Sequence, residues 1–253
     1  MVVDLSWPLS VLLISLRLAA LLIMTPILSA IAMPLNTRFL LVLVLAVLLG
    51  AAFPQAQLAG HANWAGLLGS AVRELILGLA MGLGIMVVFA AFSLAGRLLD
   101  VQMGFGLGQI FDPVMRTQIP VLSMLFGLLA MATFFAAEGH HAVLRGLAWS
   151  LERYPTGQGL VGPDALAGLI RESAGIFSLG LALVAPVVLV LLLLESGLGL
   201  LSRSLPQSNM FMLGIPVRVL SGLAALTLWL AMANPVITGI FGGMLRAWEG
   251  LFA

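Results

Sequence analysis

Long runs of apolar residues constrain this chain more than any other feature of its sequence. A helix needs about 20 residues to cross the roughly 30 Å hydrocarbon core of a bilayer. Strand-like alternation does not persist in any of the runs, so we predict an all-α integral membrane protein with about six long hydrophobic helices. The predicted helices are Leu9–Ala32, Phe39–Phe53, Leu75–Gly96, Ile119–Ala137, Ala174–Leu201 and Met210–Ala233.

The composition agrees with a membrane protein and excludes several other classes. Hydrophobic residues make up 62% of the 253 residues and charged residues 8%, whereas a soluble domain has about 25% charged residues. A net charge of +1 gives no basis for nucleic-acid binding. Because the chain has no cysteine, disulfides and cysteine-ligated metals are excluded. The amino terminus lacks a basic region and a cleavage site, so we expect the first run to be retained.

The segment Gly96–Pro120 joins the third and fourth runs and resembles neither. Glycine alternates with apolar residues over 104–108, which opposes a helix, and Asp112-Pro113 favours a turn. Apolar, non-helical backbone is tolerated at membrane depth only within protein or beside a wet cavity. We therefore predict a loop over about 97–118 that plugs or lines a pore. Its candidate residues are Met103, Gly104, Phe105, Gly106, Leu107, Gly108, Ile110, Phe111, Asp112 and Pro113.

Charged residues within or beside apolar runs are costly and are often functional. Glu195 and Arg218 lie about equally far from a turn at 205–209, so a helical hairpin would place them at one depth. We predict that they approach each other or share a polar partner; the alternative is that each reaches the membrane surface or pairs with another subunit. The candidate intramembrane charges are Arg17, Arg73, Glu74, Glu195 and Arg218.

Two further patterns concern helix packing and the polar connection after the fourth run. Gly78 and Gly82 form a GxxxG pattern, which lets two helix backbones approach closely. The connection 138–172 is predicted to hold a surface helix around Ala142–Arg153, ended by Tyr154-Pro155. The tail Asn234–Ala253 restarts an amphipathic helical pattern.

The sequence gives little support to enzymatic or metal chemistry. His140 and His141 are adjacent and therefore do not converge on one ion, and the sequence offers no obvious third ligand. The glycine run follows an apolar helix, and the chain has no lysine for a nucleotide-binding loop. Ser123, His140 and Asp112 suit a hydrolase by residue type alone. We expect no catalytic residue, no cofactor and no metal.

Arginines occur in nearly every connection, so the bias of positive charge that normally orients membrane helices is weak. Two interpretations remain open. The chain is either a weakly biased protein of six spans, or part of it is packed within a larger assembly.

The stretch Leu201–Arg218 resembles the hallmark of the FliR family, flagellar export proteins with relatives in virulence type III secretion. The family pattern is an arginine, then Pro-Gln-x-Asn, an aromatic residue, Gly-x-Pro and a basic residue. Lysine is frequent where Arg218 stands, and relatives can have glycine where Val114 follows Asp-Pro. The matching residues are Arg203, Pro206, Gln207, Asn209, Phe211, Gly214, Pro216 and Arg218.

The resemblance implies a multi-pass subunit of the flagellar type III export gate, in the bacterial inner membrane at the basal body. It implies a FliP-like part over 1–173, a FliQ-like hairpin over 174–233 and a tail over 234–253. The implied partners are FliP, FliQ, FlhB and unfolded flagellar proteins that pass through a conduit. Two alternatives are a virulence export-gate subunit and a self-contained secondary transporter that uses Glu195 and Arg218, although we see none of the repeats typical of transporters.

Overall fold

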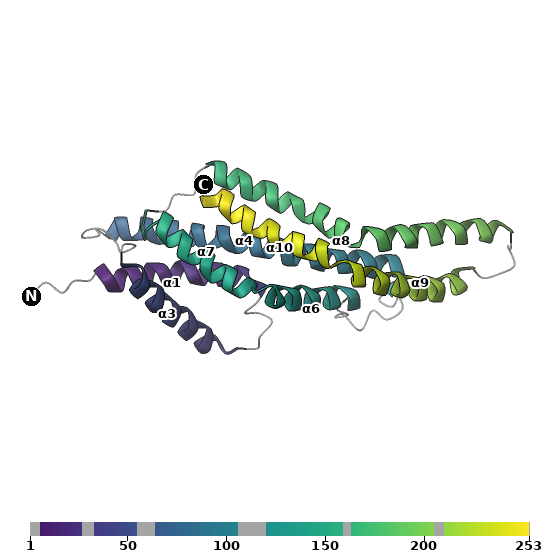
Figure 1. Cartoon of the computed structure of the whole chain (residues 1–253), viewed down its shortest axis with the longest axis horizontal. Helices are drawn as coiled ribbons and strands as arrows, with labels where there is room; N and C mark the ends of the chain where they lie inside the picture. The colour runs from purple at the N-terminus through teal and green to yellow at the C-terminus, as the bar shows by residue number, and fades with distance from the viewer. Residues whose placement is uncertain are drawn as a thin grey trace, which may run out of the picture. The chain divides into compact units, whose positions relative to one another are not determined.

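A computed structural model describes residues 6–26, 33–54, 64–105, 120–158, 163–204 and 210–252. Every regular element within these ranges is a helix (Figure 1), as the apolar runs predict. The helices are α1 (Ser6–Met24), α3 (Leu35–Ala52), α4 (Trp64–Met103), α6 (Val121–Ala136), α7 (Gly139–Arg153), α8 (Pro163–Ser204), α9 (Met210–Met232) and α10 (Asn234–Phe252).

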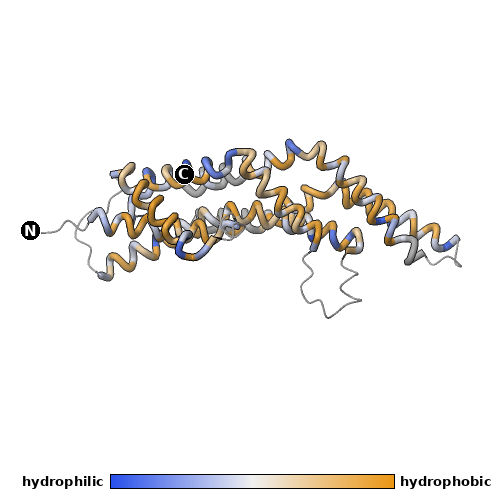
Figure 2. The backbone as a smooth tube through the Cα atoms, turned by 90° about the horizontal axis from the view of Figure 1, so that it is seen from below, coloured by the Kyte–Doolittle hydropathy of each residue, from blue (hydrophilic) through white to orange (hydrophobic). Residues whose placement is uncertain are grey.

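Five of these helices are long and apolar enough to cross a membrane, and a sixth span results if α6 and α7 are counted together. Figure 2 shows long stretches of hydrophobic residues, interrupted by hydrophilic ones. The chain is therefore an all-α integral membrane protein, as predicted from its sequence.

Two helices are much longer than the apolar runs that predicted them. Helix α4 has 40 residues and ends at Met103, so the expectation that residues 97–103 lie outside a helix is wrong. Helix α8 has 42 residues and begins at Pro163, before the predicted start at Ala174. Both predictions stopped where charged residues begin. Helix α4 continues because Arg97, Leu98 and Leu99 are good helix formers, and it ends where Gly104 adopts a positive φ.

The chain forms two compact units, which are described separately. The first contains Met1–Val88, Glu138–Ala174 and Gly242–Ala253. The second contains Phe89–Ala137 and Gly175–Phe241.

In the first unit, α1 packs closely against α4 through the GxxxG pattern. A Cβ atom added to Gly78 would lie 2.2 Å from the carbonyl oxygen of Arg17, and one added to Gly82 would lie 2.6 Å from the Cβ atom of Met24. The prediction of close helix packing at Gly78 and Gly82 is confirmed, because only a residue without a side chain permits this contact.

Helix α7 and the end of α10 also belong to the first unit. The indole of Trp248 donates a hydrogen bond to the carbonyl oxygen of Met81 at 3.1 Å. A Cβ atom on Gly146 of α7 would lie 2.5 Å from the Trp248 ring. The predicted helix in the polar connection exists, but one face of it is buried rather than lying freely on the surface.

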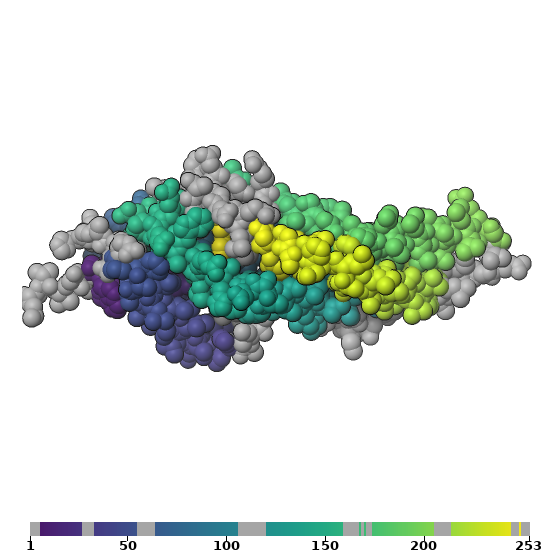
Figure 3. Space-filling view, in the orientation of Figure 1, coloured from purple at the N-terminus to yellow at the C-terminus, as the bar shows by residue number. Residues whose placement is uncertain are grey.

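In the second unit, α4 approaches α6 at Gly96, where an added Cβ atom would lie 2.4 Å from the Cα atom of Ser123. Helix α9 lies beside α8 (Figure 3), and the indole of Trp229 donates to the carbonyl oxygen of Leu183 at 2.7 Å. A cluster of aromatic rings fills this unit: Phe89, Phe92, Phe134, Phe135 and Phe241.

Candidate functional site

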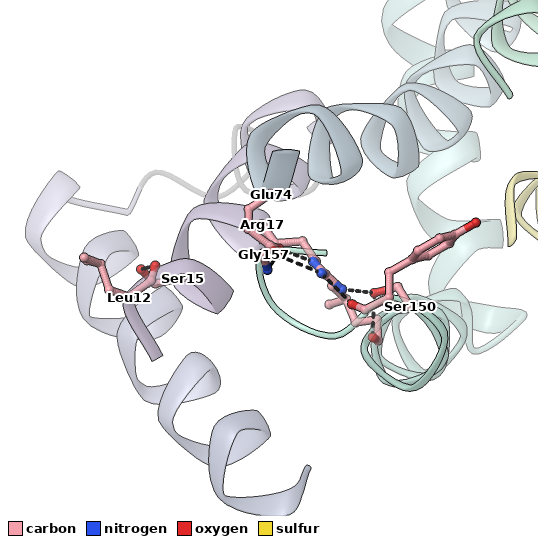
Figure 4. A network of polar contacts seen from close by, with 8 residues as sticks. Leu12, Ser15, Arg17, Glu74, Ser150 and Gly157 are labelled. Carbon is pink, nitrogen blue, oxygen red and sulfur yellow. Dashed lines mark hydrogen bonds and ion pairs between the residues drawn. The ribbon is translucent and has the colours of Figure 1, made fainter. Parts of the chain in front are cut away.

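Arg17 is fully buried in the first unit, and each of its three guanidinium nitrogens donates to a partner. Its guanidinium lies 2.5 Å from one carboxylate oxygen of Glu74 and donates to the other at 3.1 Å. It also donates to the hydroxyl of Ser150 at 3.0 Å and to the carbonyl oxygen of Tyr154 at 2.9 Å. Figure 4 shows Arg17 pointing from α1 toward Glu74 of α4 and Ser150 of α7.

Glu74 also holds the connection that follows α7. It accepts a hydrogen bond from the backbone N–H of Gly157 at 2.8 Å (Figure 4). The neighbouring Arg73 donates to the carbonyl oxygen of Gly157 at 3.1 Å. Since the exposed fractions of the Arg17 and Glu74 side chains are 0% and 1%, the pair is inaccessible to a transported solute. The pair therefore has a structural role, because it joins three helices and one connection.

Glu195 and Arg218 form an ion pair in the second unit, which confirms the predicted approach of these two residues. A guanidinium nitrogen of Arg218 lies 2.7 Å from a carboxylate oxygen of Glu195. The side chains are 33% and 46% exposed for Arg218 and Glu195 respectively. The pair joins α8 to α9 at matched distances from the hairpin turn, as their spacing in the sequence predicts.

The described part of the predicted plug segment reaches only Phe105. Met103 is fully buried at the end of α4, where its side chain fits against Gly222 of α9. Gly104 has a φ of 84°, which ends the helix in a conformation that favours glycine. The remaining candidates lie outside the described residues: Gly106, Leu107, Gly108, Ile110, Phe111, Asp112 and Pro113.

Asp100 is a residue that the sequence reasoning missed. Its carboxylate accepts hydrogen bonds from the backbone N–H of Leu122 at 3.1 Å and of Ser123 at 3.0 Å. These groups are the second and third N–H groups of α6, which have no acceptor within their own helix. Its signal depends on knowing that α4 reaches Met103, because only then does an acidic residue lie in the last turn of an apolar helix, where the helix dipole disfavours it.

The hairpin motif is described only in part. Arg203 is exposed near the end of α8, Gly214 is buried in α9, and Pro216 is exposed within the same helix. The motif residues Pro206, Gln207 and Asn209, and the side chain of Phe211, lie outside the described residues.

His140 and His141, the two histidines in the described ranges, show no metal-binding arrangement. His141 lies 3.5 Å from the exposed carboxylate of Glu138. No cluster of three or more potential ligands occurs among the described residues. The hydroxyl of Ser123, considered by type as a nucleophile, lies 3.3 Å from that of Ser93 and donates to the carbonyl oxygen of Ser93.

The chain matches the family described as "Bacterial export proteins, family 1" over residues 9–244. The chain belongs to this family. One curated relative, the flagellar biosynthetic protein FliR of Escherichia coli K12, is 28% identical over 93% of this chain and 87% of its own length. FliR of Aquifex aeolicus is 32% identical over 71% of this chain and 69% of its own length. These matches confirm the resemblance to the FliR family.

A protein named for a secretion system is also similar to this chain. The secretion system apparatus protein SsaT of Salmonella typhimurium is 29% identical over 62% of this chain and 60% of its own length. Family membership favours an export-apparatus subunit over a secondary transporter, because the match runs through almost the whole chain rather than through one helical pair.

Proposed function

We propose that this chain is a subunit of the flagellar type III export gate and helps to form and seal the conduit for unfolded flagellar proteins. The observation that carries the proposal is the family match over residues 9–244, together with FliR relatives that cover most of the chain. The flagellar assignment is favoured over the virulence one because the matches of greater coverage are flagellar proteins.

The proposed location is the bacterial inner membrane, at the flagellar basal body. Many apolar side chains at the surface of the chain support packing against lipid or other subunits, since such a surface is not stable in water. The proposed partners are FliP, FliQ and FlhB. The proposed internal division assigns 1–173 to a FliP-like part, 174–233 to a FliQ-like hairpin and 234–253 to the tail.

The first experiment is genetic. Deleting the gene in a flagellated host should abolish motility and the export of filament proteins, and a plasmid copy should restore both. Export of virulence effectors should not change. Loss of effector secretion with normal motility would instead assign the chain to a virulence system, as the SsaT relative suggests.

The second experiment tests the seal. Because α4 continues through Met103, the proposed plug is confined to residues after that helix. Deletions of two or three residues within 106–118 should raise ion leak across the membrane while the complex still assembles. A deletion of the same size within 56–62 serves as the control. Unchanged leak in assembled plug variants would remove the sealing role and leave the subunit assignment intact.

A further inference from the structure

Asp100 stands where its own helix disfavours it. The residue lies three positions before the end of α4, close to the negative end of the helix dipole, and only 4% of it is exposed. A buried carboxylate at such a position is costly unless other groups compensate it. An acidic residue at the disfavoured end of a helix indicates a role in contacts outside that helix.

The compensation comes from the first turn of α6. Pro120 precedes this helix and contributes no side-chain cap, so the N–H groups of the first turn need an acceptor from elsewhere. Asp100 supplies both of its carboxylate oxygens, one to Leu122 and one to Ser123. A carboxylate at the positive end of a helix dipole forms strong, charge-assisted hydrogen bonds.

The surrounding contacts make this cap specific to one arrangement of the helices. Gly96 lies one turn before Asp100, and a Cβ atom added to it would lie 2.4 Å from the Cα atom of Ser123, so α6 passes close to α4 here. The hydroxyls of Ser93 and Ser123 lie 3.3 Å apart. Positions 93, 96 and 100 recur at helical spacing and therefore form one stripe of α4 that contacts the start of α6. A shift of α6 along this stripe would break both bonds to Asp100.

We propose that Asp100 is a positioning residue for export: its carboxylate caps α6 from the neighbouring helix and fixes where α6 begins against α4. The consequence for permeability rests on the proposed sealing function, because the chain between these two helix ends contains the proposed plug. The positioning itself concerns described residues only and can be measured without any export.

The absence of cysteine from the chain makes the geometry directly measurable. Ser93→Cys with Ser123→Cys should form a disulfide readily under mild oxidation in the assembled complex, because the two hydroxyl oxygens are nearly in contact. Asp100→Asn keeps the shape of the side chain but replaces one acceptor by a donor that faces a backbone N–H. This substitution should slow cross-linking several-fold.

Permeability distinguishes positioning from simple stabilisation. Asp100→Asn should raise ion leak per assembled complex several-fold, and the 93–123 disulfide should return the leak toward the wild-type value. Asp100→Glu, which retains both acceptor oxygens, should have a smaller effect. Glu152→Gln makes the same chemical change at an exposed site of α7 and should alter neither measurement.

The outcomes separate the two proposals. If Asp100→Asn assembles with unchanged cross-linking, the positioning role is overturned whatever the leak. If cross-linking slows and the leak rises in deletions within 106–118 but not in Asp100→Asn, Asp100 positions α6 without serving export. If those deletions do not leak, the sealing function fails, and cross-linking still decides the role of Asp100. Should Asp100→Asn not assemble, it can be assembled with the disulfide in place and then reduced; unchanged leak after reduction would also overturn the proposal.

Discussion

The ion pairs Arg17–Glu74 and Glu195–Arg218 each join two apolar helices, and they differ in how completely the protein encloses them. Arg17 and Glu74 are buried, and their partners come from two further segments of the chain. Glu195 and Arg218 bridge two helices of a hairpin and remain a third to a half exposed. The first pair is enclosed within one unit, whereas the side chains of the second pair are exposed enough to contact a molecule outside the chain.

A charge in an apolar run therefore does not by itself indicate a functional site. A charge whose hydrogen bonds all stay within the chain is part of the fold. A charge with an exposed face in an apolar hairpin needs a neighbour, because lipid offers it no partner. The partly exposed pair therefore suits a subunit of an assembly better than a transporter that works alone.

The largest expected effect comes from replacing one member of the buried pair Arg17–Glu74. Arg17→Met should lower the free energy of unfolding by about 3–5 kcal/mol, because it leaves the carboxylate of Glu74 buried and uncompensated. Denaturant unfolding in detergent, followed by tryptophan fluorescence, measures the change. The double variant Arg17→Met/Glu74→Met should recover part of the loss. Wild-type stability in the single variant would show that the pair is open to water.

The sequence placed Arg17 and Glu74 within apolar runs but could not pair them. They are separated by 57 residues, and their partners Ser150, Tyr154 and Gly157 belong to a connection that had been predicted to lie at the surface. The contact depends on three helices and one connection meeting, which no local pattern records. Asp100 was missed for the same reason, since its hydrogen bonds go to the start of another helix.

By contrast, Glu195 and Arg218 could be paired from the sequence because a hairpin imposes symmetry about its turn. The GxxxG pattern likewise predicted close packing at Gly78 and Gly82, although it could not identify α1 as the partner. The boundaries of α4 and α8 could not be predicted because both helices extend past their apolar runs, where the arginines and glutamates are good helix formers.

The second prediction tests the close contact between α1 and α4, which keeps Arg17 and Glu74 in place. Gly78→Ala should cost about 1–3 kcal/mol, because the new methyl group would meet the carbonyl oxygen of Arg17 and push α1 away from α4. Gly69→Ala on the same helix is the matched control, since its Cβ atom would meet nothing within 4 Å. That control should be neutral or stabilising by up to about 1 kcal/mol. Equal effects in the two variants would refute the close contact.

The third prediction concerns the half-exposed pair. Glu195→Gln should cost about 1 kcal/mol or less in the isolated chain, because exposed ion pairs contribute little. Its effect on co-purification with partner subunits should be greater than its effect on unfolding. The charge swap Glu195→Arg/Arg218→Glu should restore the stability of the hairpin.

The same charge swap at the buried pair Arg17–Glu74 provides the comparison with Glu195 and Arg218. Arg17→Glu/Glu74→Arg should not recover stability, because Ser150, Tyr154 and Gly157 are oriented for the original charges. If both swaps recovered stability equally, the proposed difference between the buried pair and the partly exposed pair would be refuted.

The smallest expected effect is that of Gly222→Ala on α9. An added Cβ atom there would lie 2.7 Å from the Cε atom and 2.9 Å from the Sδ atom of Met103, which is a crowded contact of the same order as that of Gly78. The obstacle is different, however, because a thioether side chain can change rotamer whereas a helix carbonyl cannot move alone. We expect a loss of less than about 1 kcal/mol, measured by the same unfolding assay. A loss equal to that of Gly78→Ala would show that Met103 is held as rigidly as backbone, and the end of α4 would then be as firmly fixed against α9 as α4 is against α1.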